Sequence, residues 1–140
     1  MRHKYILSLL YLTILFGEED SRFTVAVIDF EPRGITAQEA GTLTDRFSSE
    51  LNNTNTMRLV ERGLVDEILQ EQGFQQSGCT TDECTVEVGA LLGVQKMVNG
   101  SIGKIGDTYT IDIKLVSVQS GATEKTKSIS YMGKVDGLIT

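Results

Sequence analysis

The chain has 140 residues, of which 40% are hydrophobic and 23% charged, as expected for one globular domain. Its formal net charge of -6 provides no broad cationic face for a phosphate backbone, so nucleic acid is not an expected partner. The single histidine, His3, leaves the rest of the chain without the commonest general base and zinc ligand, which argues against most hydrolases and metalloenzymes.

The amino terminus has the outline of a signal peptide. Basic residues within 1–4 precede an apolar run over 5–16. As a helix this run would span roughly 18 Å, short of the roughly 30 Å hydrocarbon core of a membrane. We expect residues 1–17 to direct export with cleavage near Gly17. Because Leu15 suits a cleavage site poorly, an uncleaved anchor is the alternative.

The remaining chain reads as one domain. Residues 18–23 form an acidic linker, and the domain occupies 24–140. Residues 134–139 could begin a last helix, but the sequence stops at Thr140, so we expect the domain to be truncated before a final helix.

The first half of the domain alternates between strand and helix patterns. The nearly continuous apolar run over 24–30 predicts a central strand buried on both faces. Thr36 and Glu39 have the spacing of a capping box, and apolar residues then recur at helical spacing over 37–52. This region therefore begins as an α/β domain.

The next elements are shorter. Residues 57–60 read as a second strand, and a helix follows between Arg62 and Gln72, closed by Gly73. Thr81 can cap a third helix that ends at Gly93.

The second half changes to strand periodicity. Runs over 96–105 and 109–118 alternate in polarity around a tight turn at 106–107, and a third run ends at Tyr131. A change of phase at Val116 predicts a bulge or a strand buried on both faces. The predicted fold is α/β with α+β character and the order β-α-β-α-α-β-β-β, with helices packed on a mixed sheet that closes in an antiparallel meander.

The two cysteines, Cys79 and Cys84, have C-x4-C spacing. An even count in an exported chain favours a disulfide, worth roughly 2 kcal/mol on the chain-entropy model, with free thiols as the alternative. A redox site would require C-x-x-C, and a zinc site would require further ligands.

The sequence contains no recognisable catalytic, cofactor or metal site. The glycines within 100–106 fit no phosphate-binding motif and instead mark close packing within a meander. Asp29 ends the first strand, where it is either a ligand-binding residue or a turn residue. A pocket there, with Glu31 and Arg33 nearby, would support a small-ligand-binding module or an enzyme.

Charge is unevenly distributed along the chain. Residues 34–90 contain ten acids and three arginines, whereas residues 93–134 contain six lysines and three acids. This asymmetry is consistent with two solvated faces, or with a head-to-tail ring of identical copies that associate through opposite charge.

Several segments, in order, carry a family resemblance. They are 25–31 (VAVIDFE), 59–62 (LVER), 65–74 (VDEILQEQGF), the C-x4-C link and 92–102 (LGVQKMVNGSI). Over about 24–131 the chain resembles the CsgG-type family of cell-envelope proteins, which is related to the TolB amino-terminal domain and to LpoB-like lipoproteins.

The resemblance implies an exported bacterial protein, periplasmic or associated with the outer membrane, that serves as a non-enzymatic scaffold or as an assembly or transport accessory. It implies another envelope protein, or a further copy of the chain, as the partner, and no cofactor. Any membrane contact would be made through the amino-terminal segment. The exposed edge of the meander could bind a partner by strand addition.

The chain departs from the curli-secretion members of this family in two respects. It has no lipid-anchoring cysteine near Gly17, and its meander turns are too short for pore-forming hairpins, whose strands need about 9–11 residues each. We therefore expect no pore from this chain alone.

Overall fold

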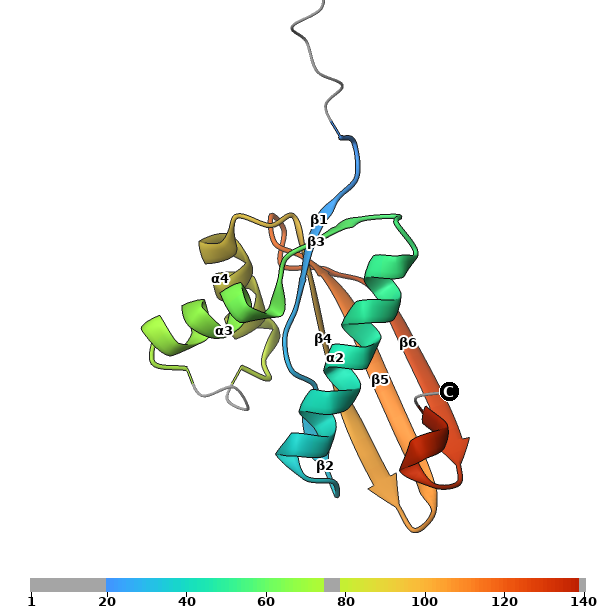
Figure 1. Cartoon of the computed structure of the whole chain (residues 1–140). Coiled ribbons are helices and arrows are strands. Elements are labelled where there is room, and N and C mark those ends of the chain that lie inside the picture. Colours follow the sequence, from blue (N-terminus) through green and yellow to red (C-terminus); the bar gives the residue numbers. More distant parts are fainter. Residues whose placement is uncertain (1–19, 75–78, 139–140) are drawn as a thin grey trace, which may run out of the picture.

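The computed structural model describes residues 20–74 and 79–138, so the predicted leader over 1–17 lies outside the described residues. Figure 1 shows a mixed sheet with helices on both faces, which confirms the predicted fold class. The elements in chain order are β1 (Thr24–Val27), β2 (Glu31–Arg33), α2 (Ala37–Asn53), β3 (Arg58–Leu59), α3 (Arg62–Glu71), α4 (Asp82–Leu92), β4 (Lys96–Ile105), β5 (Thr108–Ser117), β6 (Thr123–Met132) and the 3-10 helix η2 (Val135–Leu138).

The strand order is β3-β1-β4-β5-β6, and β2 also pairs with β4. Strand β1 lies parallel to β3 and β4, whereas β4, β5 and β6 form the predicted antiparallel meander. The middle position belongs to β4, and the prediction that the first strand is central was wrong. With ten residues, β4 is long enough to pair with β1, β2 and β5.

The predicted first strand is also interrupted. Instead of one strand over 24–30, β1 ends at Val27 and β2 begins at Glu31. The backbone amide of Phe30 turns away from the ladder and donates to Thr44 Oγ1 in α2, at 3.1 Å. The run is nearly continuously apolar because both faces of the sheet are covered here, which hides the break from sequence analysis.

Alternation along β1 builds one core on each face of the sheet. Val25 and Val27 pack with the apolar stripe of α2, and Ala26 and Ile28 pack against α3 and α4. All four side chains are buried. The prediction of a strand buried on both faces is confirmed for β1.

The helix ends follow the predicted capping signals. Thr36 Oγ1 accepts from the Glu39 amide, at 3.1 Å, and Glu39 Oε2 accepts from the Thr36 amide, at 2.8 Å. The hydrogen bonds that the Thr36 amide and hydroxyl donate to the Glu39 carboxylate lower the pKa of Glu39 below its usual value. Thr81 caps α4, which ends at Gly93 in a left-handed conformation with φ of 68°.

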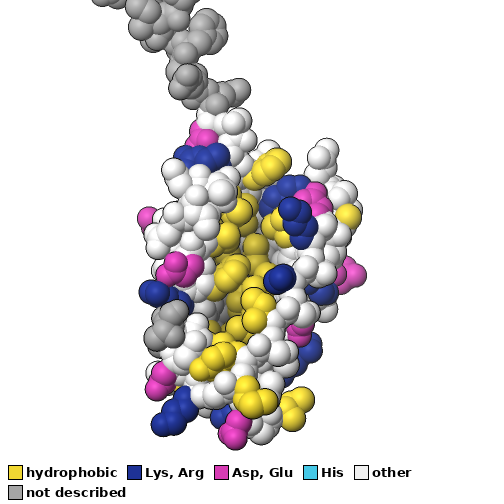
Figure 2. All heavy atoms as spheres, turned by 90° about the vertical axis from the view of Figure 1, so that its right-hand side faces the viewer, with side chains coloured by type: hydrophobic (Ala, Val, Ile, Leu, Met, Phe, Trp, Pro, Cys, Tyr) yellow, Lys and Arg dark blue, Asp and Glu magenta, His cyan; other side chains and the backbone are white. Residues whose placement is uncertain are grey.

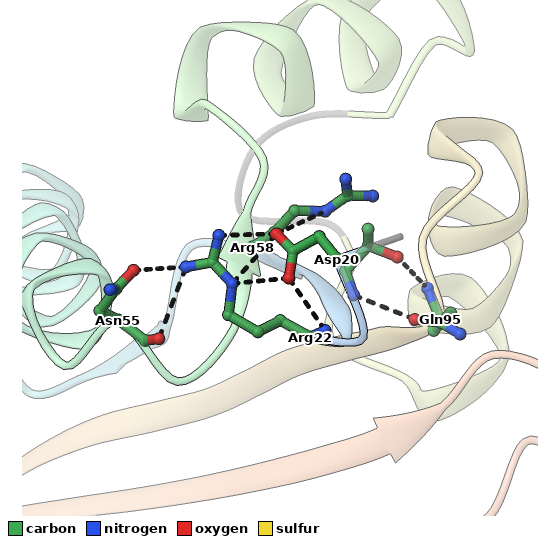
Figure 3. Close-up of polar contacts among 6 residues, drawn as sticks. Asp20, Arg22, Asn55, Arg58 and Gln95 are labelled. Atoms are coloured by element: carbon green, nitrogen blue, oxygen red, sulfur yellow. Dashed lines mark hydrogen bonds and ion pairs between the residues drawn. The ribbon is translucent and has the colours of Figure 1, made fainter. Parts of the chain in front are cut away.

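Polar contacts tie the segment before β1 to the domain (Figure 3). Arg22 pairs with Asp20 at 2.6 Å and donates to Asn55, which follows α2. The hydrogen bonds from Arg22 lower the pKa of Asp20 from 3.8 to about 2. Nearby, Thr24 exchanges hydrogen bonds with Gln95, just before β4. The described end of the predicted linker is therefore held against the sheet.

The carboxy-terminal half also follows the sequence pattern. The register between β5 and β6 shifts between Leu115 and Val116, which confirms the predicted bulge. The start of the predicted last helix appears as η2, whose Val135 and Leu138 pack on the α2 side of the sheet. Ile139, at the end of that predicted element, lies outside the described residues.

Candidate functional site

Asp29, the candidate ligand or turn residue, lies in a mostly buried ion pair with Arg62 at the start of α3. Arg62 also donates to Val27 O and to Asp45, each at 3.0 Å. Arg62 thus joins β1, α2 and α3, and Asp29 is one of its partners. Its proposed role in ligand binding stays a prediction.

Glu31 and Arg33 pair with each other at 2.9 Å and line a polar cavity of about 350 Å³ on the α4 side of the sheet. Asn99, only 5% exposed, also lines it and donates to Thr85 Oγ1 at 3.0 Å. Asn99 Oδ1 is buried without a hydrogen-bond partner among the described residues. A small-ligand site in this region stays a prediction.

Cys79 and Cys84 are joined as a disulfide. Cys79 is buried in the core beneath α3 and α4, and Cys84 lies in the first turn of α4. The bond therefore connects the start of α4 to the segment before it. Its presence in the exported protein stays a prediction.

The described residues provide no other obvious chemistry. No three histidine, cysteine, aspartate or glutamate side chains among them form a group that could hold a metal ion. Nor does any helix in the described ranges have the length and apolar character needed to cross a membrane.

The outer edge of the meander is open. Strand β6 is ten residues long, exposed at nearly every position, and pairs with no described strand other than β5. The Gly133 amide donates to Asp107 O, its opposite residue, at 3.0 Å, and the register continues directly from this pair into β6. In an antiparallel ladder every second residue of a strand forms backbone hydrogen bonds with the neighbouring strand, and the residues between them direct their backbone N–H and C=O groups to the other side. Counting from the hydrogen-bonded Gly133, the residues of β6 that direct these groups away from β5 include Thr126, Ser128 and Ser130.

An apolar groove lies between α2 and β6. It has a volume of about 420 Å³, and its lining includes Phe30, Phe47, Ile102, Ile111, Ile113 and Ile129. Figure 2 shows apolar side chains gathered along a hollow on this face, with basic side chains beside it. Ile129 on β6 is 44% exposed, so α2 leaves this part of the sheet uncovered.

Two lysines of β6 lie on the same face of the sheet as the groove. Lys127 pairs across the ladder with Ile113, and Lys125 pairs with Leu115, so both lysines share the face of Ile129. Neither lysine has an ion-pair or hydrogen-bond partner among the described residues. On the α2 side of the groove, Arg46 is paired with Glu50 at 3.0 Å.

Sequence analysis predicted the strand edge but not the groove. The alternating polarity over 109–118 predicts a strand with one apolar face, and Ile129 lies within the third predicted strand, which ends at Tyr131. How far one helix covers that face depends on packing between distant segments, for which the sequence holds no local signal.

These features define a mixed α/β domain with an open sheet edge. The family described as "Curli production assembly/transport component CsgG" matches residues 21–108. The chain belongs to the CsgG family, and the resemblance seen in the sequence is confirmed.

Solved structures share the fold at low identity. The LpoB carboxy-terminal domain from Salmonella enterica is 16% identical, with a TM-score of 0.64, over 89% of this chain and 93% of that one. Lipoprotein GNA1162 from Neisseria meningitidis is 12% identical, with a TM-score of 0.68, over 79% and 81%. The PelC dodecamer from Paraburkholderia phytofirmans is 12% identical, with a TM-score of 0.55, over 85% and 77%. The search of curated proteins found no match.

Proposed function

We propose that this protein is a non-enzymatic accessory of the bacterial cell envelope, exported to the periplasm or the outer membrane, that acts by binding another envelope protein. Membership of the CsgG family and the fold shared with LpoB and PelC support an envelope role. The side chains near Asp29 support a structural role for that residue, because Arg62 pairs with its carboxylate.

The open edge of β6 is the observation that carries this proposal. Along one line, Thr126, Ser128 and Ser130 present backbone donors and acceptors that pair with no described residue. An extended segment of a partner could pair with these groups as an added strand. Exposed lysines at Lys125 and Lys127 lie on the same strand and are typical of edges protected from indiscriminate pairing.

A pair of proline variants tests strand addition. Thr126→Pro removes an outward amide, which edge strands tolerate, whereas Lys127→Pro removes an amide that pairs with β5. We expect Thr126→Pro to keep the fold and to lose partner binding, measured by photo-cross-linking from Ser130 in intact envelopes. Lys127→Pro should lower the thermal midpoint.

Cross-linking from Glu67 provides the matched control, because this exposed residue lies on α3, which packs against β1, and β4 and β5 separate β1 from β6 in the sheet. A discrete adduct from Ser130 that is absent from Glu67 and abolished by Thr126→Pro supports the proposal. An adduct that persists in well-folded Thr126→Pro contradicts strand addition at β6.

A further inference from the structure

We propose that the partner strand added to β6 has a defined side-chain pattern, with an apolar residue opposite Ile129 and acidic residues opposite Lys127 and Lys125. This inference rests on the proposed function, strand addition at β6, and specifies the chemistry of the segment that is added. Along the partner, the pattern is apolar-x-acidic-x-acidic.

The two faces of β6 present different side chains to an added strand. Lys125, Lys127 and Ile129 lie on the α2 side of the sheet, whereas Thr126 and Ser128 lie on the opposite side. Directly opposite residues of neighbouring strands share a face and contact each other. One face of the partner strand therefore meets two cations and an apolar side chain, and its other face meets hydroxyl groups.

Ile129 ends a row of isoleucines that crosses the sheet. Ile102, Ile111 and Ile129 lie directly opposite one another on β4, β5 and β6. Ile102 is only 1% exposed, whereas Ile129 at the open edge is 44% exposed. An apolar residue of the added strand would continue this row and remove Ile129 from water, which favours association.

The two lysines face apolar residues within their own sheet. Their opposite residues on β5 are Ile113 for Lys127 and Leu115 for Lys125, and neither can neutralise a cation. Strand β5 lies on one side of β6, and no described strand lies on the other side (Figure 1). A carboxylate directly opposite either lysine in the sheet therefore has to come from the added strand, where it would form a favourable cross-strand pair.

The direction of the partner follows from the meander. Strands β4, β5 and β6 already alternate in direction, and antiparallel ladders are slightly more stable per residue than parallel ones. An antiparallel partner meets Ile129 first and Lys125 last. Small polar residues fit the two intervening positions, opposite Ser128 and Thr126.

The same pattern disfavours β6 of a second copy as the added strand. The alternate positions of β6 on this face hold lysine, lysine, isoleucine and tyrosine over 125–131. Pairing of two such strands would place lysines opposite lysines or apolar side chains, with no carboxylate on that face. The partner is therefore a segment of a different sequence.

Synthetic peptides test the pattern on the exported protein. The matching peptide has the sequence TITETET. The control peptide TIETETT has the same composition, but its isoleucine and its glutamates lie on opposite faces of a strand. A third peptide, TITKTKT, replaces both glutamates with lysine. NMR titration of isotope-labelled protein would measure each affinity and identify the backbone amides that respond.

We expect TITETET to bind with shifts at the outward amides of Thr126, Ser128 and Ser130, and TIETETT to bind about tenfold more weakly. A variant with Lys125→Glu and Lys127→Glu should prefer TITKTKT to TITETET, because the facing charges are then exchanged. Circular dichroism would verify that this variant is folded. The wild-type preference for TITETET over TITKTKT should decrease between about 0.1 M and 1 M salt, as screening increases.

Apolar substitutions test the position opposite the partner's isoleucine. Ile129→Thr keeps a β-branched residue but removes apolar surface, so it should weaken TITETET binding severalfold. Ile105→Thr is the matched control, because Ile105 is 80% exposed on β4 and lies outside β6, and it should leave binding unchanged. The reversed peptide TETETIT matches only a parallel partner and should bind more weakly than TITETET.

Equal binding of TITETET and TIETETT, or an unchanged preference in the double lysine variant, would overturn the pattern. So would tighter binding of TETETIT, which would contradict the antiparallel direction. The pattern also fails if TITETET does not bind while the Ser130 adduct forms in envelopes and is lost in Thr126→Pro, but strand addition then stands. TITETET binding that persists in folded Thr126→Pro would contradict the pattern and strand addition together.

Discussion

Arg62 connects three elements in the first half of the domain through its side chain. It pairs with Asp29 after β1 and with Asp45 on α2, and it donates to a backbone carbonyl of β1. Asp29 is separated from Arg62 by 33 positions in sequence. No local pattern relates them, which is why sequence analysis could place Asp29 at a strand end without identifying its partner.

Replacing Arg62 should therefore destabilise the fold. Arg62→Met keeps much of the side-chain volume but leaves the mostly buried Asp29 carboxylate without its cation. We expect the free energy of unfolding to fall by about 2–4 kcal/mol, measured by urea denaturation.

Asp29→Asn on the Arg62→Met background is the control, since it removes the unpaired charge. It should recover part of the lost stability, as expected for two groups that interact directly. If Arg62→Met lowers the free energy of unfolding by less than about 0.5 kcal/mol, this ion pair contributes no more to stability than an exposed pair does.

The helices and the meander were predictable because their signals are local. Thr36 and Glu39 form a capping box within four residues, and Gly93 ends α4 in the conformation that glycine favours. The break between β1 and β2 was not predictable, because Phe30 directs its amide to Thr44 of a different element.

Alanine substitutions at two helical glycines distinguish the effect of helix propensity on stability from the effect of packing. A Cβ added at Gly41 in α2 would meet no atom within 4 Å, whereas at Gly89 in α4 it would lie 2.6 Å from Met97 Cγ and from Val118 Cγ2. Gly41→Ala should raise the free energy of unfolding by about 0.5–1 kcal/mol. Gly89→Ala should lower it by about 1–3 kcal/mol through overpacking.

Chemical denaturation of the two variants, side by side, measures both effects. Each variant gains the same methyl group. If the free energy of unfolding rises in one variant and falls in the other, the difference is due to the close approach of α4 to β4. Equal stabilisation by both substitutions would show that α4 can move away from the sheet at little cost.

At the level of the whole molecule, the predicted leader and the cysteine pair concern the same property, which is export. We expect protein recovered from a bacterial envelope to lack residues 1–17 and to contain an oxidised Cys79–Cys84 pair. Intact mass measured before and after reduction and alkylation tests both expectations.

Reduction should lower the free energy of unfolding by about 2 kcal/mol, because the six-residue loop constrains the unfolded chain only modestly. The Cys79→Ala, Cys84→Ala double variant is the control and should not respond to reductant. Free thiols in the freshly recovered protein would contradict the disulfide, and a full-length mass would favour the uncleaved anchor.

Short-range patterns were sufficient to predict the order of the elements from α2 onward, the helix caps, the bulge at Val116 and the antiparallel meander, because each depends on neighbours within a few residues or on one adjacent strand. They were also sufficient to indicate the CsgG family. The middle position of β4, the pairing of Asp29, the apolar groove and its location opposite α4 emerged only when the chain was folded. These features depend on how one helix packs across strands far apart in sequence, and therefore on long-range packing, which the sequence pattern does not encode locally.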